Sequence, residues 1–299
     1  MAEDKIDFND LRKRAVSQPL VSDKFTADPS AHVFDGNIYI YPSHDIDAGI
    51  PFNDNGDHFG MRDYHAYLME SPEDNEAVDL GKILDIDDVL WAKRQMWAPD
   101  IARKGDKYYF YFPAKDKDDI FRIGAAVGDS PGGPFTPDPE PIKGSYSIDP
   151  AVFNDSGKYY MYFGGLWGGQ LQKYRDNLYN SKNDLRADGD LAFGPMVAEM
   201  SDDMLSFSNT PKEIVILDEG GNPLLAGDNK RRYFEGPWVH KYRNKYYLSY
   251  STGDTHFICY AVSENPTGPF KYVGRILEPV VGWTTHHSIC EFEGRWFLF

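Results

Sequence analysis

The chain of 299 residues contains only two cysteines, Cys259 and Cys290, and no long apolar run. Two cysteines cannot form a framework of several disulfides, so we expect both to be small buried apolar side chains. A membrane-spanning helix needs about 20 consecutive apolar residues, and no stretch of this sequence approaches that length. The composition therefore argues against a disulfide-stabilised small protein and against a helical membrane protein.

Positive charge is also scarce, with 31 Lys and Arg against 47 Asp and Glu, which gives a formal net charge of −16. Nucleic acids and anionic membranes bind basic patches, so we expect neither as a partner, whereas a neutral or cationic ligand is compatible. The first residues, MAEDKIDFND, lack a basic region followed by an apolar one. We therefore expect no signal peptide and a cytoplasmic protein, with secretion or export to the periplasm as the alternative if the chain has been shortened.

Long helical periodicity is absent, whereas aromatic residues make up 15% of the chain. The runs 38–41, 108–112, 159–163 and 246–250 are aromatic or β-branched and are bounded by turn residues. Such runs are typical of strands, and the turns between them contain residues that tolerate positive φ. The sequence therefore predicts an all-β fold.

The predicted strands form a repeat. Each copy has an opening residue, an apolar run, a turn with Gly or Asn, and a second run rich in Tyr or Phe. The openers, in order, are Asp28, Ala98, Asp149, Glu235 and His286. Four copies align without gaps, and the Glu235 copy is one residue longer because Gly236 follows the acid. Units of antiparallel strands repeated every roughly 50 to 90 residues are typical of propeller blades.

Five copies predict a five-bladed β-propeller over residues 25–299, with residues 1–24 as a segment that helps close the ring. The fifth copy reaches only Phe299, so its blade is expected to be incomplete, either because it is abbreviated or because the chain has been shortened. The inner strand of each blade lines the axis of a propeller. The five openers should therefore meet there, although they lie far apart in the sequence.

Three of the five openers are carboxylates. Two carboxylates that flank a glycosidic bond suffice for its hydrolysis, because one protonates the leaving oxygen and the other activates water or attacks carbon. A third carboxylate nearby would raise the pKa of the acid by repulsion between like charges. Carbohydrate sites also use aromatic side chains, and four tryptophans lie close to the openers. We predict substrate contacts for Trp97, Trp167, Trp238 and Trp283.

The motifs around the openers resemble those of glycoside hydrolase family 43, from about residue 25 to the end. They are Asp28 in ADPSAHVFDGNIYIYPSHD, Asp149 in SIDPAVF, Glu235 in YFEGPWVHK and His286 in TTHHSI. The resemblance implies a five-bladed propeller that inverts the anomeric carbon of xylose- and arabinose-containing glycans. It also implies Asp28 as general base, Glu235 as general acid and Asp149 as modulator of the acid's pKa. Inversion predicts base and acid carboxyls about 6.5–9.5 Å apart.

The resemblance further implies a metal site on the propeller axis. His286 matches a histidine that faces an ion, often calcium, in many relatives, and its neighbour His287 cannot be separated from it by sequence, although the alignment favours His286. Calcium prefers oxygen ligands, so a lone histidine would act together with water. A hydrogen-bonded histidine without metal is the alternative, and no organic cofactor is expected.

Other segments are candidates for the rim of the pocket. Residues 59–67 resemble the family's Asp-Tyr-His segment, which makes His65 a candidate substrate contact. His44 and Asp45 follow the first hairpin and are placed either at the rim or in solvent, with His44 taken as a further candidate. The longest interruption between openers, residues 166–232, should form loops that wall the pocket and help set exo or endo action.

The sequence thus predicts an exo-acting, inverting β-xylosidase or α-L-arabinofuranosidase whose partner is an oligo- or polysaccharide. An endo-arabinanase with the same acids on an open groove is one alternative, and a non-catalytic glycan-binding propeller is another. A binding module would gain nothing from three repelling carboxylates. Retaining fructan hydrolases carry an Asn-Asp-Pro-Asn opener, unlike Ala27-Asp28-Pro29-Ser30 here. The choice of sugar, the linkage and the oligomeric state stay open.

Overall fold

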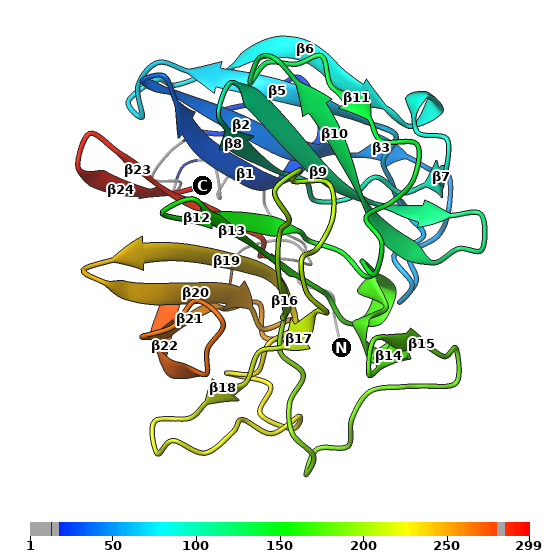
Figure 1. Cartoon of the computed structure of the whole chain (residues 1–299), viewed down its shortest axis with the longest axis vertical. Helices are drawn as coiled ribbons and strands as arrows, with labels where there is room; N and C mark the ends of the chain where they lie inside the picture. The colour runs from blue at the N-terminus through cyan, green and yellow to red at the C-terminus, as the bar shows by residue number, and fades with distance from the viewer. Residues whose placement is uncertain (1–12, 14–17, 280–284) are drawn as a thin grey trace.

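The structure is a computed structural model that describes residue 13, residues 18–279 and residues 285–299. It consists of strands joined by loops and three short 3-10 helices, which confirms the predicted all-β class (Figure 1). Among the described residues no helix is long and apolar enough to cross a bilayer. The 3-10 helices are η1 (Ile86–Asp88), η2 (Trp167–Gly169) and η3 (Leu171–Lys173).

Four sheets of four or five strands make up most of the fold. The first has the order β1-β2-β5-β6 and the second β11-β10-β9-β7, with β8 also paired to β9. The strands of the first sheet are β1 (Thr26–Phe34), β2 (Asn37–His44), β5 (Asp63–Met69) and β6 (Val78–Asp85). Those of the second are β7 (Ala92–Arg94), β8 (Asp100–Lys104), β9 (Lys107–Asp116), β10 (Phe121–Gly128) and β11 (Thr136–Pro137).

The third sheet has the order β12-β13-β16-β17, and the fourth β18-β22-β21-β20-β19. The third consists of β12 (Ala151–Asp155), β13 (Lys158–Phe163), β16 (Met196–Glu199) and β17 (Lys212–Glu213). The fourth consists of β18 (Ile216–Leu217), β19 (Glu235–Tyr242), β20 (Lys245–Ser251), β21 (Ile258–Ser263) and β22 (Phe270–Leu277). All neighbours in these two sheets are antiparallel except β18 and β22.

Three two-stranded sheets complete the fold. They are β3 (Ile46–Asp47) with β4 (Phe59–Gly60), β14 (Tyr174–Arg175) with β15 (Leu178–Tyr179), and β23 (Ile289–Phe292) with β24 (Arg295–Leu298). The last pair, red in Figure 1, lies beside β1. Cys290 and Phe292 share a buried cluster with Ala31 and Ile38 of the first sheet, so the end of the chain packs against its beginning. Both cysteines are buried and free, as predicted.

The predicted repeat units correspond to the sheets. In each unit the strand after the opener is an edge strand paired to a Tyr- or Phe-rich neighbour, as in β12 with β13 and β19 with β20. The sheets are arranged as the blades of a β-propeller, with three buried clusters of aromatic and aliphatic side chains. The prediction that residues 1–24 help close the ring falls mostly outside the described residues.

Candidate active site

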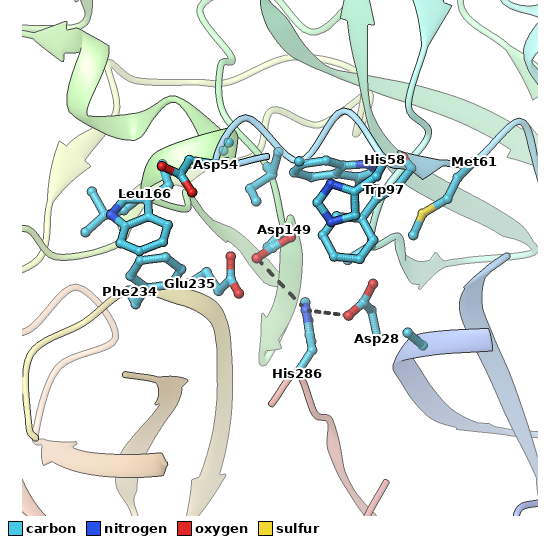
Figure 2. A pocket seen from close by; sticks show the side chains of 18 of the residues that line it. Asp28, Asp54, His58, Met61, Trp97, Asp149, Leu166, Phe234, Glu235 and His286 are labelled. Carbon is cyan, nitrogen blue, oxygen red and sulfur yellow. Dashed lines mark hydrogen bonds and ion pairs between the residues drawn. The ribbon is translucent and has the colours of Figure 1, made fainter. Parts of the chain in front are cut away.

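The five openers line one pocket, although they come from five different parts of the chain. Asp28 lies on β1 and Glu235 begins β19, whereas Ala98, Asp149 and His286 lie in the turns that lead into β8, β12 and β23. All five contribute to a cavity of about 90 Å³ (Figure 2). The convergence that the repeat predicted is therefore present in the structure.

At or directly after each acidic opener, the backbone adopts a positive φ value. Asp28 and Asp149 have positive φ values of 53° and 57°, which Asp tolerates better than most residues. In the longer copy Gly236 takes this conformation, with φ of 62°, directly after Glu235. The pairing of β1 with β2 and that of β19 with β20 both shift register at the opener. Such bulges re-aim a side chain, which is how edge strands turn these carboxylates toward the pocket.

His286 lies between two of the carboxylates. Its Nδ1 is 3.6 Å from Oδ1 of Asp28 and 3.9 Å from Oδ2 of Asp149 (Figure 2). The other oxygen of Asp28 accepts a hydrogen bond of 2.7 Å from the Ser43 hydroxyl. The Gly236 amide donates to Oδ2 of Asp149 over 2.9 Å. Asp28 and Asp149 are thus each contacted from two sides, by His286 and by Ser43 or Gly236.

Burial and mutual repulsion determine the protonation of the acids. Glu235 is 9% exposed and Asp149 is 4% exposed. Burial, then the charges of Asp149 and Asp28, hold the pKa of Glu235 well above its ordinary value. Burial also raises the pKa of Asp149 to about 6; His286 opposes this rise and Asp28 adds to it. Burial, followed by repulsion from Asp28, raises the pKa of Asp45 to about 6. Glu235 is therefore the carboxyl most suited to carry a proton at neutral pH.

The predicted aromatic contacts divide into two groups. Trp97 and Trp167 line the pocket. Trp238 does not belong to its described lining, because the side chain turns away and its Nε1 donates to the carbonyl of Ile289 over 2.8 Å. The Trp238 ring instead lies 5.4 Å from that of His32. Trp283 lies outside the described residues.

His44 and His65 lie beside each other but are not among the described residues that line this pocket. The His44 Nδ1 is 2.6 Å from Oδ1 of Asp63, and the His65 Nδ1 is 2.9 Å from Oδ1 of Asp79. Rim contact in the first hairpin instead comes from Asp45, which does line the pocket. A direct substrate contact by either histidine stays a prediction.

Several pocket residues carried no signal in the sequence. Asp54, His58 and Met61 line the pocket from the loop that connects β3 to β4 and β5. Asp54 and His58 precede the stretch 59–67 that resembles the family's Asp-Tyr-His segment, whereas Met61 lies within it; no repeat copy aligns with the loop. Asp100, two residues after Ala98, is the acid of the second copy, but it is buried between blades, 2.6 Å from Nε2 of His32. The fold is needed to tell this buried carboxylate between blades from the carboxylates that line the pocket.

The surroundings of His286 do not form a calcium cage. Calcium takes six to eight oxygen ligands, whereas His286 offers a nitrogen whose Nδ1 faces Asp28 and Asp149. One oxygen of each carboxylate is already bonded to Ser43 or Gly236. His287, the neighbour of His286, is buried, and its ring shares a hydrogen bond of 2.6 Å with the Ser249 hydroxyl, away from the pocket. An ion at His286 would therefore be held mainly through water.

Comparison with known proteins gives consistent matches. The model of the family "Glycosyl hydrolases family 43" matches residues 17–278. A xylosidase/arabinosidase 43A from Humicola insolens is 59% identical over 94% of this chain and 89% of its own length. A xylosidase/arabinosidase from Bacteroides ovatus is 58% identical over 94% and 86%. A crystal structure of a β-xylosidase/α-arabinofuranosidase from a compost microbial metagenome, in complex with xylotriose and in a calcium-free form, has a TM-score of 0.92 at 64% identity over 95% and 87%.

Proposed function

The chain belongs to glycosyl hydrolase family 43, and we propose that it removes single xylose or arabinose units from the ends of plant glycans. It is a glycosidase, an enzyme that hydrolyses O-glycosyl bonds. The observation that carries the proposal is the convergence of Asp28, Asp149 and Glu235 on one pocket with two tryptophans. The names of the relatives, xylosidase and arabinosidase, support the choice of pentose substrates.

We assign Glu235 as the general acid. Its pKa is held well above the ordinary value by burial and by the charges of Asp149 and Asp28, which favours the protonated carboxyl that can protonate the oxygen of the leaving sugar as the glycosidic bond breaks. Asp149 supports this role, since its negative charge adds to the rise in the pKa of Glu235. Its bond to the Gly236 amide ties it to the backbone beside the acid.

We assign Asp28 as the general base. The Ser43 hydroxyl fixes one of its oxygens, which leaves the other to accept a proton from a water molecule as that water attacks the anomeric carbon. Asp28 and Glu235 lie on different sides of the pocket in Figure 2. This arrangement supports attack on the face opposite to the leaving group, which inverts the configuration.

Exo action is supported by the size of the pocket. The cavity of about 90 Å³ is lined by the 166–169 segment on one side and by Asp54, His58 and Phe59 on the other. A narrow pocket admits the end of a glycan, whereas an endo-arabinanase would require a groove open at both ends. The long insertion was predicted to wall the pocket. In support of this, η2 lies at the start of the insertion and its residues line the pocket.

Two finer points of the sequence analysis also belong to this proposal. We count β23–β24 as an abbreviated fifth blade beside the four larger sheets. Its support is that β1, β8, β12, β19 and β23 contact one another in cyclic order. Calcium on the axis stays a prediction, and no step of the reaction is assigned to a metal.

The proposal is tested by incubating the protein with nitrophenyl β-xyloside, nitrophenyl α-L-arabinofuranoside, xylobiose, arabinan and xylan. We expect release of single pentoses, with the opposite anomer formed first as followed by proton NMR. Oligosaccharides as the first products from arabinan would indicate endo action. No release from any of these substrates would refute the glycosidase proposal.

A further inference from the structure

A second and wider cavity of about 600 Å³ adjoins the active-site pocket. The two cavities share Asp54, Trp167 and Gly168, so they adjoin at these residues, which are called the shared rim. Much of the far wall of the second cavity comes from the long insertion, including Lys173 and Tyr179. Asp28, Asp149 and Glu235 do not line the second cavity.

The second cavity lies on the side of the general acid. In Figure 2 Asp54 lies on the same side as Glu235, and Asp28 lies opposite. The ring of Trp167, at the shared rim, is 5.5 Å from that of Phe234, the residue before Glu235. A general acid delivers its proton to the leaving oxygen. The sugar that departs must therefore extend from the acid's side of the pocket, toward the shared rim.

The lining of the second cavity fits an uncharged, hydroxyl-rich ligand. Its Arg94 is neutralised by Asp57 at 2.7 Å and by Asp119 at 2.9 Å. Lys173 donates to the carbonyl of Asn183 over 2.8 Å. The remaining surface offers amides, hydroxyls, the carboxylates of Asp54 and Asp184, and the ring of Tyr179, which is 39% exposed. Carboxylates and amides accept hydrogen bonds from sugar hydroxyls, and an open aromatic ring can pack against a sugar.

One buried lysine in this wall has only a long ion pair. The side chain of Lys115 is 3% exposed, and its Nζ is 3.7 Å from the nearest carboxylate oxygen, on Asp57. Its ammonium lies 5.0 Å from the centre of the Phe121 ring. Such a group has hydrogen-bond donors left for a ligand, and removing one would leave a bound hydroxyl without its partner.

We propose that this second cavity, the leaving-group pocket, binds the pentose units on the leaving side of the scissile bond, with Tyr179 and Lys115 as contacts. The proposal rests on the proposed function and deepens it. It makes the protein selective for oligosaccharides with several units behind the terminal sugar.

The test compares kcat/KM for xylotetraose and for nitrophenyl β-xyloside, whose leaving group is a single ring. Tyr179→Ala and the volume-conserving Lys115→Met should lower kcat/KM for xylotetraose about three- to tenfold, with less than a twofold change for nitrophenyl xyloside. Tyr242→Ala is the matched control, because Tyr242 is 41% exposed and lines neither cavity. Equal losses on both substrates, or no loss on either, would overturn the leaving-group pocket. A wild-type protein without any glycosidase activity would overturn the proposed function itself.

A separate cluster carries a second inference. His44 ends β2, and Asp63 and His65 lie two residues apart on the neighbouring strand β5, so their side chains leave the strand on the same face. One possible ligand atom from each residue lies within 4.8 Å of those of the other two. Within the described part of the chain no other group of three His, Cys, Asp or Glu meets this criterion.

The hydrogen bonds around this cluster prepare it for an ion. Both oxygens of Asp79 lie within 3.0 Å of Nδ1 of His65, and Lys24 pairs with the same carboxylate at 2.8 Å. A carboxylate bonded to Nδ1 holds the proton there and leaves Nε2 as the ligand nitrogen, an arrangement common among metal-binding histidines. The His44 Nδ1 and the Asp63 carboxylate share a hydrogen bond of 2.6 Å, whose proton an ion would displace.

We propose that His44, Asp63 and His65 bind a divalent transition-metal ion of the zinc type. Two imidazoles and one carboxylate are a ligand set for Zn²⁺, Ni²⁺ or Cu²⁺, and they do not suit calcium, which requires oxygen. The site is distinct from His286, and its strand β2 continues directly into Asp45 at the active-site pocket.

The test is calorimetric titration of the metal-free protein with Zn²⁺. We expect one site in the wild type, lost in His65→Ala and in His44→Ala and retained in His286→Ala. Asp79→Asn, which keeps the shape of the side chain, should weaken the affinity about 10- to 100-fold. Absence of Zn²⁺ binding by the wild type, or unchanged binding by both histidine variants, would overturn the proposal.

Discussion

The substitution Asp149→Asn is the most direct test of how the pocket controls its acid. The change removes one negative charge from a side chain that is 4% exposed. It keeps an oxygen that can accept the hydrogen bond from the Gly236 amide, now 2.9 Å from Oδ2. The geometry around Glu235 should therefore persist while the repulsion that raises its pKa becomes weaker. We expect the pKa of Glu235 to fall.

The size of this fall can be estimated from the structure. Asp149 bonds to the amide of the residue next to Glu235, and its charge contributes to the raised pKa of Glu235, so the two carboxyls interact directly. Two unit charges about 6 Å apart interact by about 2.8 kcal/mol at an effective dielectric constant of about 20, which corresponds to about 2 pKa units. Burial remains and keeps the pKa of Glu235 above its ordinary value.

The assay is the pH dependence of kcat/KM for xylobiose, which reports the ionisation of the free enzyme. Loss of the proton from the acid sets the alkaline limb, so this limb should move to lower pH by about 2 units in Asp149→Asn. Circular dichroism and thermal unfolding would check that the variant is folded. A folded variant whose alkaline limb moves by less than about 0.5 units, or to higher pH, would refute the assignment of Asp149 as modulator.

Three further outcomes follow from the same geometry. Glu235→Ala should lose far more activity on xylobiose than on dinitrophenyl xyloside, whose leaving group needs no proton; equal losses measured by initial rates would contradict the acid assignment. Asp28→Ala should reduce kcat at least about 10³-fold on both substrates, and near-normal rates would remove Asp28 as base. For Asp45, the folded-state pKa of about 6 lies above the usual value, so its ionisation costs stability as the pH rises through about 6. Asp45→Asn should therefore raise the free energy of unfolding by about 1–2 kcal/mol at pH 8 and little at pH 4; equal gains at both pH values in denaturant titrations would count against it.

The repeat made much of the fold predictable. Aromatic and β-branched runs between turns identified the paired strands, for example β12 with β13 and β19 with β20. The small edge sheets were not predictable in the same way. β14–β15 and β3–β4 have two residues per strand, too few to show alternation, and their pairing depends on contacts between loops.

Some residues of the site could be predicted from the repeat, and others could not. The openers could be found because the repeat places equivalent positions at one axis. Asp54 and His58 could not, because their loop has no counterpart in the other copies and its course depends on packing. Trp238, by contrast, was expected in the pocket because it closely follows an opener, but its ring nitrogen donates to the carbonyl of Ile289. Distance along the chain from a catalytic residue does not tell on which side of a strand a side chain will lie.

The all-β class, the repeat, the family and the three carboxylates that meet in the pocket could all be predicted from the sequence. These follow from local patterns, because strand alternation, turn residues and repeated openers are encoded within a few residues of each other. The resemblance implied Glu235 as the acid, but the physical reason lies in the fold, because the pKa of Glu235 is raised by burial and by the charges of Asp149 and Asp28. These residues lie far from it in the sequence and approach it only when the blades come together.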